Sequence, residues 1–115
     1  MLIITRQAPW SGLGAREALD IALAGGAYDL PLAMLFLDDG VFQLASQPQP
    51  ELLQQKNLAA NLQALPLFGI EDLYACGHSL AQRGLSGDAL APPVQLLDDQ
   101  ALRGLLARYD LVVTL

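Results

Sequence analysis

Reactive and metal-binding side chains are scarce in this chain of 115 residues, which has one cysteine, Cys76, and one histidine, His78. A single cysteine excludes an internal disulfide framework, so nothing in the sequence indicates an oxidising compartment. A structural zinc site needs four suitable ligands, which one cysteine and one histidine do not provide. The sequence therefore predicts no bound metal.

Charge is also scarce, and positive charge is the rarer sign. Asp, Glu, Lys and Arg make up 16% of the chain, against about 25% in a typical soluble protein. Lys56 is the single lysine, and the net charge is −6. Neutralising the phosphates of a nucleic acid requires clustered Lys and Arg, and the sequence has no such cluster. We therefore expect no direct contact with nucleic acid.

Long hydrophobic runs are missing as well. The longest apolar run, residues 30–37, is far too short to cross a bilayer. The amino terminus has neither the basic segment nor the small-residue cleavage site of a signal peptide. These absences predict a cytoplasmic protein that does not enter a membrane.

Hydrophobic residues, by contrast, make up 53% of the chain. A small domain has a large surface for its volume, so its composition should be rich in charge. The low charge favours a chain that covers part of its surface with other proteins. The alternative is the Ala- and Leu-rich composition of a biased genome.

Apolar segments of strand length alternate with segments of helical periodicity along the chain. The predicted strands are residues 2–6, 32–37, 70–75, 94–97 and 110–115. Helices are predicted at residues 13–24 and 78–83, between Pro50 and Pro66, and after Asp98, and Gly25 and Gly26 are predicted to end the first of them. This alternation predicts an α/β fold, a parallel sheet covered by helices on both faces, in a single domain of residues 1–115.

Cys76 falls at the turn between the third predicted strand and the helix that follows. Ligands and chemistry collect at this carboxyl edge of an open α/β sheet. The amino end of a helix favours a thiolate, so Cys76 is a candidate catalytic or persulfide-carrying residue. The alternative is an inert, buried cysteine that acts as a small hydrophobic residue. His78 is two positions away and would not face the thiol on a helix, so a Cys–His pair is not expected.

Two other motifs resemble ligand sites only in part. Residues 12–14, Gly-Leu-Gly, resemble part of a dinucleotide fingerprint, but Glu17 stands where a third glycine is needed and would repel pyrophosphate. Asp38 and Asp39 could belong to the Mg²⁺ pocket of a phospho-receiver. Such a site also needs an aspartate after the third strand, where this chain has Cys76. The sequence therefore predicts no bound cofactor.

Large apolar residues, Val41, Phe42 and Leu44, occupy the connection after the second predicted strand. They could fold back on the domain's own core, or they could contact a neighbouring subunit. Because the low overall charge favours hidden surface, we predict that they are buried against another chain.

Several segments carry a family resemblance, and they follow one another in order along nearly the whole chain. They are GAREALD (14–20), DGVFQL (39–44), YAC (74–76) with SL (79–80), RGL (83–85) and YDL (109–111). In this order and spacing, the chain resembles the TusC/DsrF type of subunit within the DsrE/DsrF/DsrH family.

The resemblance implies a three-layer α/β/α sandwich with a five-stranded, mostly parallel sheet. It also implies assembly with TusB-like and TusD-like subunits into a heterohexamer that contains two copies of each. In that system, sulfur arrives through a small carrier and moves as a persulfide. It then leaves to a further carrier and a tRNA thiouridylase, which forms 2-thiouridine at the wobble position. Relatives in sulfur-oxidising bacteria use a similar complex in sulfur oxidation.

The resemblance also bears on Cys76. It implies that the sulfur-accepting cysteine belongs to the TusD/DsrE-type subunit, at the turn that Cys76 occupies here, and that TusC-type subunits are mainly structural. We therefore predict that Cys76 is dispensable for most of the relay. The alternatives are a stand-alone flavodoxin-like domain that binds a nucleotide or flavin, and a free-standing cysteine sulfurtransferase.

Overall fold

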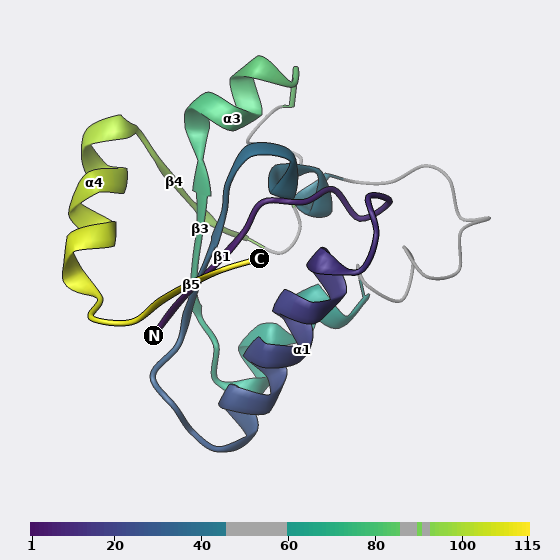
Figure 1. Ribbon diagram of the computed structural model, residues 1–115, viewed down its shortest axis with the longest axis vertical. Helices are drawn as coiled ribbons and strands as arrows, with labels where there is room; N and C mark the ends of the chain where they lie inside the picture. Colours follow the sequence, from purple (N-terminus) through teal and green to yellow (C-terminus); the bar gives the residue numbers. More distant parts are fainter. Residues whose placement is uncertain (46–59, 86–89, 91–92) are drawn as a thin grey trace.

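A parallel sheet of five strands forms the centre of the molecule (Figure 1). The computed structural model describes residues 1–45, 60–85, 90 and 93–115. The order across the sheet is β4-β3-β2-β1-β5, and all four pairings are parallel. The strands are β1 (Leu2–Thr5), β2 (Ala33–Phe36), β3 (Asp72–Cys76), β4 (Gln95–Leu97) and β5 (Val112–Thr114). Each of them overlaps a predicted strand, so the prediction of a five-stranded, mostly parallel α/β sandwich is confirmed.

Helices cover both faces of this sheet, as predicted. Figure 1 shows α1 (Gly14–Ala27) on one side and α4 (Asp99–Arg108) on the other, with α3 (Gly77–Gln82) continuing from the end of β3. Two 3-10 helices, η1 (Asp38–Leu44) and η2 (Leu65–Phe68), lie in the connections. Most of the helix predicted between Pro50 and Pro66 lies outside the described residues. No helix in the described part of the chain is long and apolar enough to span a bilayer.

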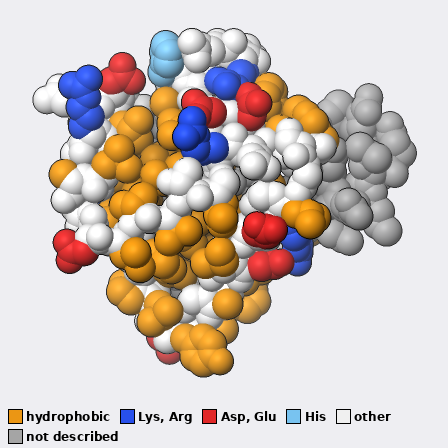
Figure 2. Space-filling model, viewed as in Figure 1, with side chains coloured by type: hydrophobic (Ala, Val, Ile, Leu, Met, Phe, Trp, Pro, Cys, Tyr) orange, Lys and Arg blue, Asp and Glu red, His pale blue; other side chains and the backbone are white. Residues whose placement is uncertain are grey.

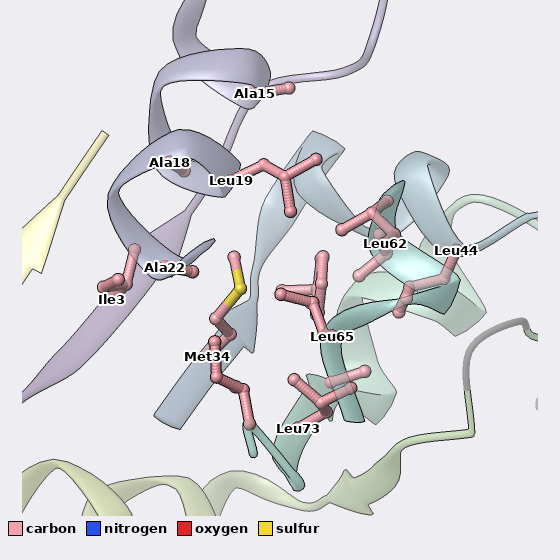
Figure 3. Packing of buried hydrophobic residues seen from close by; sticks show 14 of the residues in the cluster. Ile3, Ala15, Ala18, Leu19, Ala22, Met34, Leu44, Leu62, Leu65 and Leu73 are labelled. Carbon is pink, nitrogen blue, oxygen red and sulfur yellow. The ribbon is translucent and has the colours of Figure 1, made fainter. Parts of the chain in front are cut away.

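The core has two parts, one on each face of the sheet. Apolar residues of α1 recur at helical spacing, so one side of the helix joins a buried cluster that also contains Ile3, Met34 and Leu73 from three neighbouring strands (Figure 3). On the other face, strand residues such as Leu2 and Leu35 pack beneath α4. Central parallel strands are buried on both faces, which explains why β1 and β2 are apolar throughout.

The prediction that Gly25 and Gly26 end the first helix is wrong, because both lie inside α1 and are buried. A Cβ added to Gly26 would lie 2.8 Å from the carbonyl oxygen of Phe68, and one added to Gly25 would overlap the side chain of Leu32. These glycines allow the helix to approach its neighbours closely, and α1 continues to Ala27.

The prediction that Val41, Phe42 and Leu44 are buried against another chain is wrong for two of them. Val41 and Leu44 are completely buried, in the same core cluster as the apolar residues of α1. Phe42 is half-buried, and the centroid of its ring lies 5.1 Å from that of Trp10. The 3-10 helix η1 folds this connection back over the sheet, so Val41 and Leu44 complete the chain's own core.

Candidate functional site

Figure 1 shows β2 and β3 leading into η1 and α3 at the carboxyl edge of the sheet. Polar and charged side chains from the ends of β1, β2 and β3 are hydrogen-bonded to one another there. We call this group the carboxyl-edge cluster, and it consists of Arg6, Asp38, Asp39, Cys76, Ser79 and Arg83. Parallel strands bring their carboxyl ends together, so residues distant in sequence meet at this edge. Here the structure brings together Cys76 and the Asp38–Asp39 pair, which the sequence suggested for separate sites.

Cys76 is both the last residue of β3 and the N-cap of α3, as its predicted place at a strand-to-helix turn requires. Its sulfur accepts a hydrogen bond from the backbone N–H of Ser79 at 3.4 Å. The residue is only 4% exposed. A sulfur that caps a helix satisfies an N–H group that would otherwise lack a partner, so Cys76 has a clear structural task.

Ser79 connects the Cys76 turn to the end of β2. Its hydroxyl oxygen accepts a hydrogen bond from the backbone N–H of Asp38 at 3.0 Å. Its carbonyl oxygen accepts another from Nη1 of Arg83 at 3.2 Å. This contact could not be predicted from the sequence, because Ser79 and its partner Asp38 are 41 positions apart.

The two aspartates of the cluster are paired with arginines. Nη2 of Arg6 lies 2.7 Å from Oδ2 of Asp38, and Nε of Arg83 lies 2.8 Å from Oδ1 of Asp39. Exposed pairs of this kind contribute about 0–1 kcal/mol each. Within the described residues, no group of three or more His, Cys, Asp and Glu side chains could hold a metal ion. The two carboxylates are therefore engaged by arginines that hold this surface loop in place, an arrangement that differs from a Mg²⁺ pocket.

His78 does not join the thiol. It is exposed in the first turn of α3, and it lines a cleft of about 320 Å³ together with Leu97 and Asp98 among others. Cys76 is not one of the residues that line this cleft. The expectation that Cys76 and His78 form no catalytic pair is therefore consistent with their placement.

Gly12 and Gly14 each have a structural reason that requires no bound phosphate. Gly12 has a φ of +119°, which suits the tight turn before α1. A Cβ added to Gly14 would overlap the side chain of Gln7. Gly14 thus makes room for Gln7, and this geometry does not favour the nucleotide-binding alternative.

These features describe a three-layer α/β sandwich whose single cysteine caps a helix at the carboxyl edge of the parallel sheet. The chain belongs to the DsrE/DsrF-like family, which it matches over residues 1–115.

Comparison with known proteins identifies close relatives. The chain is 67% identical over 115 residues to the TusC homolog of Pseudomonas aeruginosa, covering 100% of this chain and 97% of that protein. It is 38% identical over 101 residues to the TusC homolog of Vibrio vulnificus, covering 88% and 86% of the two chains. The crystal structure of the E. coli ychN protein is similar in fold. Its TM-score is 0.74 at 21% identity, and the match covers 99% of this chain and 97% of that one.

Proposed function

We propose that this chain is a TusC-like, mainly structural subunit of a heterohexameric sulfurtransferase complex. The complex relays persulfide sulfur for the formation of 2-thiouridine at the tRNA wobble position. The observation that carries this proposal is the 67% identity, over the full length of the chain, to a TusC homolog. Residues 1–115 would act as one domain beside TusB-like and TusD-like subunits, in the cytoplasm.

The setting of Cys76 supports a structural role rather than a carrier role. A persulfide carrier must expose its sulfur to an incoming persulfide and must have room for a second sulfur atom, about 2.05 Å from the first. The sulfur of Cys76 is instead covered and accepts a hydrogen bond from Ser79. The sulfur carriers upstream and downstream would therefore exchange sulfur with another subunit of the complex.

The charge distribution supports an indirect relation to tRNA. The net charge is −6, and Arg6 and Arg83 are each paired with an aspartate of the chain itself. Paired arginines offer little to a phosphate backbone, which is bound through the release of its counterions by free positive charge. Contact with tRNA would belong to the downstream enzyme.

We expect this chain, tagged and expressed in its native cell, to purify with two other chains of the TusB and TusD types in equal amounts. Mass spectrometry and light scattering of the purified material would identify the chains and measure the mass of the complex. A chain that elutes alone would contradict the proposal. Absorbance in the flavin bands would instead support the flavodoxin-like alternative.

A second prediction concerns the thiol. We expect a Cys76→Ser complex to keep at least about half of the wild-type level of 2-thiouridine in cells that lack the native subunit, because serine is also a good N-cap residue. The modified nucleoside would be measured by mass spectrometry of digested tRNA. The matched control is substitution of the sulfur-accepting cysteine in the TusD-like partner, which should abolish thiolation. Loss of thiolation in the Cys76→Ser complex, with the complex still assembled, would make Cys76 a relay cysteine.

A further inference from the structure

We draw no further inference here: the strongest candidate, the cleft of about 320 Å³ between the first turns of α3 and α4, which His78 (pale blue in Figure 2) lines together with Asp98 and Asp99, carries none, because its charged rim is an acidic cluster for which no second feature among the described residues indicates a ligand or a partner.

Discussion

Replacing Gly40 with alanine is expected to lower the free energy of unfolding by roughly 3 kcal/mol, a large fraction of the total stability of a typical domain. Gly40 lies in η1, directly against the end of β1. An added Cβ would overlap the carbonyl oxygen of Thr5, and it would lie 2.8 Å from the carbonyl carbon of Thr5 and 3.3 Å from Cα of Arg6. These are backbone atoms, so no side-chain rotation can relieve the overlap. Urea denaturation followed by circular dichroism would measure the loss.

The matched control is Gly104→Ala. Gly104 is exposed within α4, and a Cβ added there would meet nothing within 4 Å. Alanine is a better helix former than glycine, so this variant should be more stable than the wild type by about 0.5–1 kcal/mol. If the two substitutions changed stability in the same direction, the close packing of η1 on β1 would not be the cause of the Gly40 effect.

The second large effect is expected at Gln43, which is buried in the same 3-10 helix. Its side-chain Nε2 donates hydrogen bonds to Oγ1 of Thr5 at 2.8 Å and to the carbonyl oxygen of Gln7 at 2.9 Å. Gln43→Ala would leave both acceptors without this donor and would open a cavity. The expected cost is about 2–4 kcal/mol, measured by the same denaturation experiment.

Two further variants separate the causes of that loss. Gln43→Met keeps most of the side-chain volume but removes the hydrogen bonds. It also removes Oε1, which is buried without a hydrogen-bond partner among the described residues, so it should cost less than alanine does. Gln82→Ala, at an exposed position of α3, should change stability by no more than about 0.5 kcal/mol. Equal losses from the Gln43 and Gln82 alanine variants would show that the buried amide does not hold η1 in place.

Gly40 and Gln43 give the segment of residues 39–44 a structural role. Gly40 packs against the carbonyl of Thr5, and Gln43 binds the hydroxyl of the same residue. Val41 and Leu44 between them complete the core. These contacts hold the connection after β2 against the end of β1.

The sequence predicted what depends on local pattern. The five strands and the position of Cys76 follow from apolar runs and from the turn after β3, both of which can be read within a few residues. The errors concern contacts that no short segment encodes. Whether Gly26 ends a helix or permits close packing depends on Phe68, far along the chain. In the same way, the bond between Ser79 and Asp38 exists only once β2 and β3 lie side by side.

The pairing of β1 with β5 has a consequence for the making of the protein. Leu2 of β1 pairs with Val112 of β5. About 110 residues must therefore be synthesised after β1 before β5, its second neighbour in the sheet, is available. At about 5–20 residues per second, this interval is on the order of ten seconds. During that time, β1 can pair with β2 on one side only. The backbone groups on its other edge stay unpaired, and this apolar strand can associate with other chains. The yield of folded protein should then depend on the speed of translation and on the crowding of nascent chains. Neither quantity changes the stability of the folded sheet.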